Sequence, residues 1–501
     1  MVDSPEQILA AMQKQIVEEH MTVETEVTST FSWSLDDLAS STDGELVGPL
    51  AEAHSVKFNS VSTDTRTLQP GALYIAIKGD NFDGHKFIAE AVKQGAVAVL
   101  ISEDVDSIVP GVMVDDTRIA LGQFARWHRL QMPVKTLVAV TGSNGKTTIK
   151  TLLESLFSRA GNTLATEGNL NNDFGVPRTL LNLRPEHEYA VIEMGANHPL
   201  EISYLTALAL PNIAMINNAS GAHLEGFGSL QGVINTKGEI YQGLNQRLAD
   251  GSGIAIVNTD SPGYEDWLAS LADLGVSNIV QFGAAEQADF RVSDCQIAEK
   301  GAGIRFQLNF NQQSYDVEMP VLGFHNAMNA AACVAIANAA GLTWQQIQPG
   351  LASFTGVSGR LQKTQIASGW LVDDSYNANP ESVKAGIAAL VSLPGEAIVC
   401  LGAMAEIGDE SEQAHEEVAL FAKAKGVQQL YVLGEGAKNM PKTFGENGYY
   451  FDNHQTLAQA VAEQVQHAKS ENKLLNVLVK GSRSAKMELV SEQLLKDDSI
   501  N

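Results

Sequence analysis

The chain has 501 residues, 44% of them hydrophobic and 18% charged, a composition that is ordinary for a globular protein with roughly two to four separate cores. Its 59 acidic residues outnumber 33 lysines and arginines, and the net charge of −26 disfavours non-specific binding to nucleic acid or to an anionic membrane. Three distant cysteines indicate neither a disulfide framework nor a zinc site. Because no apolar run approaches the ~18 residues of a membrane span and no secretory leader is evident, we expect a cytoplasmic protein.

Residues 1–30 are polar and acidic and hold little that could build a core, so we expect an N-terminal extension. Over residues 31–116, the apolar runs "GALYIAI", "GAVAVLI" and "GVMVDD" alternate with helix-like segments such as "SLDDLASS" and "HKFIAEAVKQG". This alternation predicts a small α/β domain.

A second domain is expected over residues 117–357. It opens with the helical pattern "TRIALGQFARWHRL", and strand-like runs then recur at "TLVAV", "YAVIEM", "IAMIN" and "GIAIVN". Over residues 358–501, strand-like runs such as "EAIVCLG" and "LNVLVKGS" again alternate with helices. The sequence therefore predicts an α/β protein of three domains, with a mostly parallel central sheet flanked by helices and a Rossmann-like C-terminal domain.

The segment "TGSNGKTT", residues 141–148, lies between a strand-like run and a helical pattern. In that position glycines let backbone N–H groups converge on a phosphate, Lys146 adds a mobile positive charge, and the Thr147 hydroxyl can ligate Mg²⁺. The general pattern G-x-x-x-x-G-K-[ST] is incomplete, because Val140 stands in place of its first glycine. An ordinary glycine-rich turn is the alternative.

Three further residues stand where they could take part in phosphate chemistry. Glu193 ends the strand-like run "YAVIEM", and a carboxylate at a strand end beside a phosphate loop can hold magnesium. His223 follows another strand-like run in a loop of small residues, and Lys237 lies at the predicted start of a helix. A solvated carboxylate, a structural histidine and a surface lysine are the respective alternatives.

Taken together, these residues resemble the Mur ligases, the ATP-dependent amide-bond-forming enzymes of bacterial peptidoglycan synthesis. The family pattern includes TG-x-x-GK-[ST] without the first glycine, the strand-end glutamate, Asn-x4-His (Asn218 to His223), the helix lysine, and the segment here written "GFHNAMNAAA". Within the family, "STDTRTLQPGALYIAIKGDNFDGH", "VDDSYNANPES" and "VKGSRSAKME" are most similar to members that add D-alanyl-D-alanine. The resemblance covers about residues 31 to 490, and only the acidic extension is unmatched.

The resemblance implies a reaction. ATP would transfer its γ-phosphoryl group to the tripeptide carboxylate of UDP-N-acetylmuramoyl-tripeptide, and the amine of D-alanyl-D-alanine would then displace phosphate from the acyl phosphate. Two Mg²⁺ ions are implied, one held by Thr147 and Glu193 and the other near His223 and Lys237. Since an ammonium group cannot ligate a cation, the family's answer is a carbamate that Lys237 forms with CO₂, which a lowered pKa would favour.

The resemblance also assigns binding residues. Catalytic roles fall to Lys146, Glu193, His223 and Lys237. The nucleotide set is Gly142, Ser143, Asn144, Gly145, Lys146, Thr147, Thr148, Asn326, Asn329, Arg360 and Asp374. The UDP-sugar set is Thr63, Asp64, Thr65, Arg66, Lys78, Gly79, Asp83, Gly84 and His85, with Asn169 near the phosphates. The D-alanyl-D-alanine candidates are Asn377, Asn379 and the segment from Lys480 to Arg483.

Several alternatives stay open at this stage. Helix capping could explain the two asparagines of "HNAMN", a simple turn could explain "TDTR", and a surface ion pair could explain Arg483. The whole chain could also be an amide ligase for another amino acid or for folate, or a P-loop regulator that uses ATP as a conformational switch. We expect a monomer that binds UDP-N-acetylmuramoyl-tripeptide and D-alanyl-D-alanine, but neither nucleic acid nor a membrane.

Overall fold

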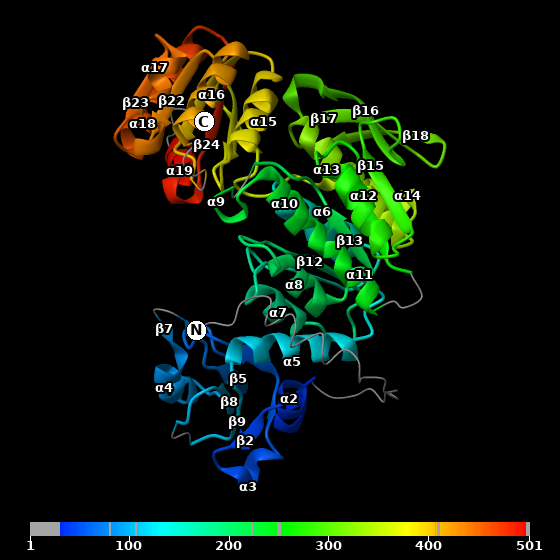
Figure 1. Cartoon of the computed structure of the whole chain (residues 1–501). Helices are drawn as coiled ribbons and strands as arrows, with labels where there is room; N and C mark the ends of the chain where they lie inside the picture. Colours follow the sequence, from blue (N-terminus) through cyan, green and yellow to red (C-terminus); the bar gives the residue numbers. More distant parts are fainter. Residues whose placement is uncertain are drawn as a thin grey trace.

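The computed structural model describes residues 31–79, 82–105, 108–221, 224–247, 252–405, 407 and 411–496. The predicted extension, residues 1–30, and His223 lie outside this described part of the chain. Three α/β units follow one another along an elongated molecule, with the N-terminal unit at one end and the C-terminal unit at the other (Figure 1). The predicted α/β class with three domains is confirmed.

The N-terminal unit is built on a five-stranded sheet in the order β2-β9-β8-β5-β4, parallel except for the pair β2–β9. Its strands are β2 (Glu45–Val47), β4 (Ser60–Ser62), β5 (Ala72–Ile75), β8 (Ala98–Ile101) and β9 (Gly111–Met113). Two small ribbons pair β1 (Trp33–Ser34) with β3 (Lys57–Phe58) and β6 (Lys78–Gly79) with β7 (Phe82–Asp83). The helices are α2 (Leu35–Thr42), α3 (Leu50–Ala53), the 3₁₀ turn η1 (Gly84–Phe87) and α4 (Ile88–Lys93).

The central unit contains a nine-stranded sheet in the order β11-β12-β10-β13-β14-β15-β16-β17-β18. Its strands are β10 (Thr136–Thr141), β11 (Thr163–Ala165), β12 (Tyr189–Glu193), β13 (Ile213–Ile216), β14 (Ile254–Asn258), β15 (Asn278–Gly283), β16 (Phe290–Ile297), β17 (Ile304–Phe310) and β18 (Gln313–Met319). The four strand-like runs predicted here form β10, β12, β13 and β14. The antiparallel ribbon from β16 to β18 was not predicted, although buried and exposed residues alternate along β17.

Helices cover both faces of this sheet. They are α5 (Thr117–Gln131), α6 (Lys146–Phe157), α7 (Gly175–Leu180), α8 (Glu201–Ala209), α9 (Leu224–Phe227), α10 (Leu230–Gly238), α11 (Gln242–Arg247), α12 (Tyr264–Asp273), α13 (Phe324–Ala339) and α14 (Trp344–Ser353), with the 3₁₀ turns η2 (Glu239–Tyr241) and η3 (Glu299–Gly301). The alanine-rich α13 packs on α6 and on strands β14 to β17. It thereby brings its N-terminal end close to the start of α6.

The C-terminal unit has a six-stranded sheet in the order β19-β20-β24-β21-β22-β23, parallel except for the pair β19–β20. Its strands are β19 (Gln362–Ile366), β20 (Gly369–Asp374), β21 (Glu396–Gly402), β22 (Gln429–Leu433), β23 (Gly448–Phe451) and β24 (Leu475–Lys480). The helices are α15 (Pro380–Val391), α16 (Ser411–Ala424), α17 (Met440–Phe444), α18 (His454–Ser470) and α19 (Glu488–Lys496).

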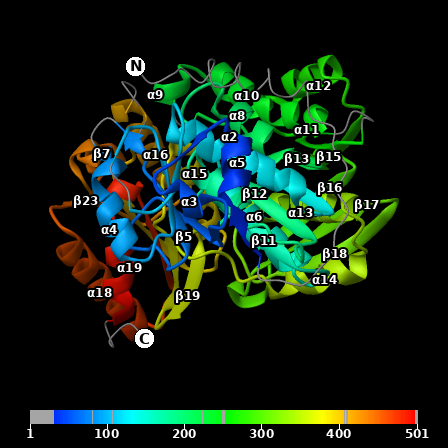
Figure 2. The same cartoon turned by 90° about the horizontal axis from the view of Figure 1, so that it is seen from below.

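Helix α5 joins the first two units. Asp116 caps it by accepting hydrogen bonds from the N–H groups of Arg118 and Ile119. Its buried face shares one core with Trp33 of the N-terminal unit and Leu205 of the central unit, whereas the cores of the C-terminal sheet consist almost entirely of its own residues. Seen from below, the N-terminal unit lies in front of the junction between the other two (Figure 2). Hydrogen bonds from Arg360 to Thr147 and from Asn379 to Asn144 join the C-terminal unit to the central one.

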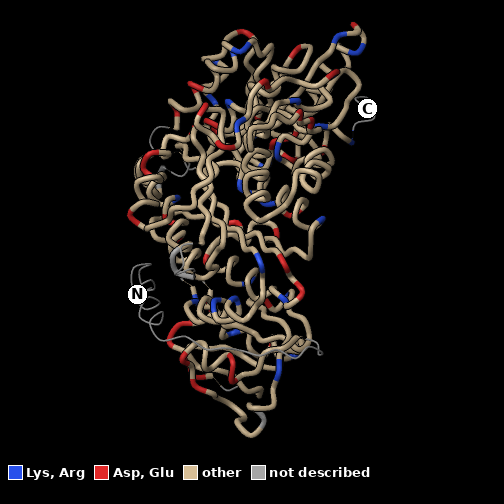
Figure 3. The backbone as a smooth tube through the Cα atoms, turned by 90° about the vertical axis from the view of Figure 1, so that its right-hand side faces the viewer, with Lys and Arg blue, Asp and Glu red and all other residues tan. Residues whose placement is uncertain are grey.

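Acidic and basic residues are interspersed along all three units (Figure 3). Among the described residues, no helix combines the length and the apolar character that crossing a membrane requires.

Candidate active site

The predicted phosphate loop is the turn between β10 and α6. Gly145 has a φ of 83°, and a Cβ there would lie 2.3 Å from Asn217 Nδ2, so both backbone conformation and space require glycine. Lys146 donates from Nζ to the carbonyl oxygen of Gly142 at 2.7 Å, and burial lowers the pKa of its ammonium group. The loop thus brings a cation to the N-terminus of a 12-residue helix, which is a suitable environment for a phosphate.

Glu193 lies beside this loop because β12 pairs with β10, placing Glu193 opposite Val140. Its side chain is only 2% exposed. Oε1 accepts a hydrogen bond from Asn171 Nδ2 at 2.8 Å, whereas Oε2 is buried without a hydrogen-bond partner among the described residues. A buried carboxylate oxygen without a donor is costly, and a divalent cation would supply its partner. The residues present at Glu193 therefore fit a Mg²⁺ ion.

Three asparagines hold this region together: Asn218, which was named from the sequence as part of the family pattern, and Asn171 and Asn217, which were not selected. Asn144 N donates to Asn218 Oδ1 at 2.9 Å, and Asn217 and Asn218 both donate from Nδ2 to Asn144 O, at 2.9 and 3.2 Å. Asn171 contacts Glu193, while the predicted Asn169 is exposed. The signal for Asn217 and Asn218 was their position directly after the buried strand β13, since the carboxyl ends of parallel strands share one edge of a sheet.

A cavity of about 460 Å³ opens between the phosphate loop and the C-terminal unit. The predicted residues that line it are Ser143, Asn144, Gly145, Lys146, Thr147, Thr148, Glu193, Asn326, Asn329, Arg360, Asp374, Asn377 and Asn379. Two hydrogen bonds cross it: Arg360 Nη2 donates to Thr147 Oγ1 at 3.0 Å, and Asn379 Nδ2 donates to Asn144 Oδ1 at 2.9 Å. The C-terminal unit therefore reaches the phosphate loop directly.

Asn326 and Asn329 lie in the first two turns of α13, both buried at this cavity. The residue that caps the helix is Gly323, with no side-chain cap hydrogen bond, so helix capping does not explain these asparagines. The neighbouring His325 also lines the cavity, and burial together with the charge of Lys480 lowers its pKa to about 4. This histidine was not selected from the sequence.

In the C-terminal unit, Lys480 and Asp374 form a buried ion pair across strands β24 and β20. Lys480 Nζ lies 2.6 Å from Asp374 Oδ2 and donates to the carbonyl oxygen of Asn377 at 2.9 Å. The ion pair thus occupies the ammonium group of Lys480, the first residue of the segment named as a D-alanyl-D-alanine candidate. Arg483 is exposed and pairs with Glu488 at 3.0 Å, and it is not among the residues that line the cavity.

Lys237 lies in the last turn of α10, which corrects the expectation that it starts a helix. The start is at Leu230, because the hydroxyl of Ser229 accepts a hydrogen bond from Gly232 N and caps the helix there. Only 2% of Lys237 is exposed, and burial, followed by the positive charge of Lys146, lowers its pKa to about 7. The same neighbourhood holds Glu239, which accepts hydrogen bonds from Leu200 N and Ser203 N at 2.8 and 3.0 Å.

The predicted UDP-sugar residues gather at the carboxyl ends of β4 and β5. Residues 63–66 follow β4, and Lys78, Gly79 and Asp83 belong to the β6–β7 ribbon. Burial, followed by the charges of Asp64 and Asp83, raises the pKa of Tyr74 to about 12, and the Tyr74 hydroxyl donates to the carbonyl oxygen of Gly84 at 3.0 Å. Arg66 donates from Nε to Asp64 Oδ1 and from Nη2 to Asp64 Oδ2, a bidentate contact that holds the pKa of that carboxyl at about 2. Residues 63–65 of the turn are half-buried, and Arg66 is exposed.

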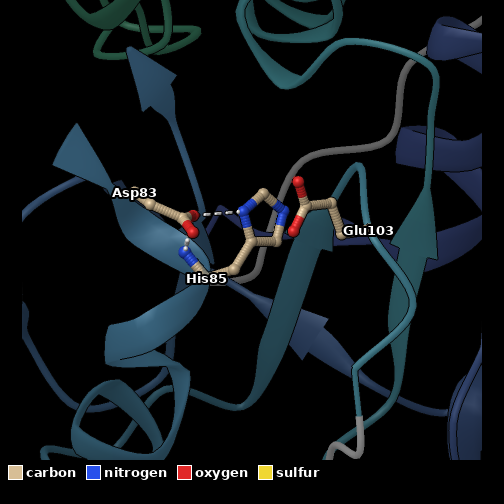
Figure 4. A group of neighbouring side chains, drawn as sticks. All are labelled: Asp83, His85 and Glu103. Atoms are coloured by element: carbon tan, nitrogen blue, oxygen red, sulfur yellow. Dashed lines mark hydrogen bonds and ion pairs between the residues drawn. The ribbon is translucent and has the colours of Figure 1, made fainter. Parts of the chain in front are cut away.

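His85 is buried in this unit beside Asp83 and Glu103 (Figure 4). Ser102 N donates to His85 Nε2 at 3.0 Å, so Nδ1 carries the proton and donates to Asp83 Oδ1 at 2.9 Å. Glu103 pairs with Lys78. Because both ring nitrogens are engaged, this cluster does not offer a metal site; His85 instead fixes the chain near Lys78 and Gly79, which are exposed.

The fold and the site define a nucleotide-binding α/β protein in which a phosphate loop faces a second α/β unit across a polar cavity. Three family models match: "Mur ligase family, catalytic domain" over residues 57–129, "Mur ligase middle domain" over 140–337, and "Mur ligase, glutamate ligase domain" over 359–483. The chain belongs to the Mur ligase family.

Individual proteins in the family are similar to this chain over most of their length. The UDP-N-acetylmuramoyl-tripeptide–D-alanyl-D-alanine ligase of Escherichia coli K12 is 41% identical over 465 residues, 92% of this chain and 98% of that protein. The crystal structure of MurF from Acinetobacter baumannii has a TM-score of 0.86 and 32% identity, covering 93% of this chain and all of that one. MurF from Thermotoga maritima, solved in complex with ADP, has a TM-score of 0.77 and 28% identity, covering 87% and 97%.

Proposed function

We propose that this protein is an ATP-dependent ligase that joins the tripeptide carboxylate of UDP-N-acetylmuramoyl-tripeptide to the amine of D-alanyl-D-alanine. The products are the UDP-N-acetylmuramoyl-pentapeptide, ADP and phosphate, and the reaction is a step of peptidoglycan synthesis. The observation that carries this proposal is the near full-length similarity to an Escherichia coli ligase of that name, in a chain whose phosphate loop, Glu193 and C-terminal unit line one cavity.

Two bond changes make up the reaction. A carboxylate oxygen of the tripeptide attacks the γ-phosphorus of ATP, and the bond from that phosphorus to ADP breaks. The neutral amine of D-alanyl-D-alanine then attacks the acyl carbon, forms the C–N bond, expels phosphate with the former carboxylate oxygen and loses a proton. The first step brings two anions together, so cationic groups aimed at the phosphates should contribute much of its rate enhancement.

Residues of the central unit are suited to the nucleotide. Lys146 and the amides of residues 142–148 would hold the β and γ phosphates, and Arg360 reaches the same place from the C-terminal unit through its contact with Thr147. The adenine would lie at Asn326 and Asn329, with Asp374 at the ribose. Domain closure over the cavity would exclude water from the acyl phosphate.

Thr147 and Glu193 would hold one Mg²⁺ ion, and Lys237, as a carbamate, would hold a second with His223. The buried oxygen of Glu193 without a partner among described residues supports the first site. The lowered pKa of Lys237 supports the second, because only a neutral amine reacts with CO₂. When bound, such ions neutralise the phosphate charges during phosphoryl transfer.

The remaining substrate groups are assigned to the outer units. Residues 31–116 would bind the UDP-sugar through Thr63, Asp64, Thr65, Arg66, Lys78, Gly79 and Asp83, with His85 holding that loop and Asn169 near the phosphates. Residues 117–357 would bind ATP, and residues 358–501 would bind D-alanyl-D-alanine through Asn377, Asn379 and Arg483. We further propose that the protein acts as a monomer in the cytoplasm.

One reaction mixture tests this function. The protein is incubated with ATP, Mg²⁺, UDP-N-acetylmuramoyl-tripeptide and D-alanyl-D-alanine, and the products are identified by mass. The proposal predicts the UDP-linked pentapeptide and ADP, with ADP formation requiring both substrates. ADP formation without the dipeptide or the UDP-tripeptide would instead indicate an ATP-driven switch, and a product formed only with another amine would indicate a different ligase.

A further inference from the structure

Three buried asparagine side chains form a continuous hydrogen-bonded row from the phosphate loop to the first turn of α13. Asn217, Asn326 and Asn329 are 3%, 7% and 4% exposed. Asn217 Nδ2 donates to Asn144 O and to Asn329 Oδ1, both at 2.9 Å. Asn329 Nδ2 donates to Asn326 Oδ1 at 3.1 Å, and Asn326 Nδ2 donates to Leu322 O at 2.8 Å. The row ends on a backbone carbonyl at each side.

These two carbonyl ends fix the direction of every amide between them. A carbonyl oxygen accepts hydrogen bonds only, so Asn217 must turn its NH₂ group toward Asn144 O, and Asn326 must turn its NH₂ group toward Leu322 O. Asn329 can then satisfy both neighbours in one orientation alone, with its oxygen toward Asn217 and its nitrogen toward Asn326. Turning any of the three amides over would place two oxygens or two NH₂ groups against each other in a buried site.

This fixed direction leaves a defined hydrogen-bonding edge at the cavity. An amide has two N–H donors and two acceptor lone pairs, and Asn326 uses one donor on Leu322 and one lone pair on Asn329. One N–H and one lone pair remain on Asn326, which lines the cavity. The N–H of such an amide can donate to N7 of adenine while its oxygen accepts from the 6-amino group. Asparagine distinguishes adenine from other bases by this pair of hydrogen bonds.

We propose that Asn217 is a specificity-determining positioning residue. By fixing the amides of Asn329 and Asn326, it makes the cavity prefer a 6-aminopurine nucleoside triphosphate to a 6-oxopurine one. This inference rests on the proposed ATP site. It assigns base preference to a side chain that acts through Asn329 and Asn326 of α13 rather than through its own contact with the base. Asn217 lies after β13, 112 residues before Asn329.

Asn217 also supports the phosphate loop, because its Nδ2 contacts Asn144 O and limits the space at Gly145. Loss of that support would affect all nucleoside triphosphates alike, since they share the triphosphate. A change in the ratio of kcat/KM between two nucleotides that differ only in the base therefore reports on the orientation of the amides and not on the support of the phosphate loop. ATP and ITP differ at C6, where an amino donor is replaced by an oxo acceptor, and both retain N7.

The test measures kcat/KM for ATP and for ITP in the complete ligase reaction. Asn217→Asp keeps the shape of the side chain but offers only oxygens to Asn144 O and Asn329 Oδ1. Asn329→Asp still accepts from Asn217, leaves the phosphate-loop contact in place, and removes the donor to Asn326. The matched control is Asn258→Asp, a buried asparagine whose Nδ2 donates to Asn217 O at 2.6 Å outside the row of amides.

In both Asn217→Asp and Asn329→Asp, the ratio of kcat/KM for ATP to that for ITP is expected to fall about tenfold or more. In Asn258→Asp it should stay within about twofold of the unmodified protein. The inference is overturned if both test variants slow ATP and ITP in equal proportion, if the control shifts the ratio as much, or if the unmodified protein does not prefer ATP. Absence of any ligated product with ATP would instead refute the proposed function.

Discussion

The buried ammonium group of Lys237 is predicted to lower the free energy of unfolding of the protein. Burial and the charge of Lys146 lower its pKa from 10.5 to about 7, a shift of about 3.5 units, and one unit corresponds to about 1.4 kcal/mol. Replacing it by methionine keeps most of the side-chain volume and removes the buried ammonium group. Below pH 7 the Lys237→Met variant should therefore exceed the unmodified protein in free energy of unfolding by up to about 5 kcal/mol.

The sign of the pH dependence follows from where the proton sits. Below pH 7 Lys237 is charged in both the folded and the unfolded chain, so the folded state carries the full cost of the buried charge. Between pH 7 and about 10.5 the unfolded lysine stays protonated while the folded one is neutral, and the cost falls as pH rises. This net cost already includes the attraction between Lys237 and Glu239, which acts to raise the pKa of Lys237.

Urea unfolding in CO₂-free buffer from pH 6 to 10.5 measures this effect. The stability difference between Lys237→Met and the unmodified protein should shrink steadily above pH 7 and approach zero near pH 10.5. Lys135→Met is the control, because Lys135 is 67% exposed and pairs with Glu188 at the surface, and its difference should stay flat below pH 10. Parallel stability curves for Lys237→Met, or a variant less stable at pH 7, would refute the reasoning.

Three further substitutions address the nucleotide site, the metal site and the core. Lys146→Ala, which removes the loop cation, should lower ATP-dependent product formation at least about 10²-fold, and near-normal turnover would contradict its assignment to the phosphates. Lys237→Ala should be inactive in ligation and partly restored by acetate, which replaces the carbamate oxygens; an unaffected variant would remove Lys237 from the metal site. His128 accepts a hydrogen bond from Trp33 Nε1 at 3.0 Å, and burial lowers its pKa to about 4. Between pH 6.5 and 4, therefore, only the unfolded chain takes up this proton. The free energy of unfolding should fall by about 3 kcal/mol over that range. His128→Gln should reduce this acid dependence in urea unfolding, and an unchanged dependence would show that other groups cause it.

The sequence predicted those parts of the site that follow from local patterns. A buried run followed by glycines, Lys146 and a helical pattern can fold as a strand, a phosphate loop and a helix, and the structure has β10 and α6 there. Glu193 could be placed at a strand end because β-branched and aliphatic residues precede it. The parallel order of β12, β10 and β13 then brings their carboxyl ends, and so Glu193 and Asn217, to one edge.

Contacts between distant segments could not be predicted in this way. The row from Asn217 to Asn329 depends on α13 packing on α6, and no spacing within either segment encodes that approach. The pairing of Lys480 with Asp374 depends on the register of β24 against β20, so the sequence alone could not decide between an internal ion pair and a substrate anchor. For Lys237, the capping serine at Ser229 was the local signal that could have placed the residue at the end of its helix.

The central claim is that the terminal phosphoryl group of ATP passes to the tripeptide carboxylate before the amide forms. Its most direct test uses UDP-N-acetylmuramoyl-tripeptide labelled with ¹⁸O in that carboxylate, with the mass of the released phosphate as the measurement. The account predicts that each phosphate carries one ¹⁸O atom from the carboxylate and that labelling requires both ATP and D-alanyl-D-alanine. Phosphate released without ¹⁸O while the pentapeptide forms would contradict it.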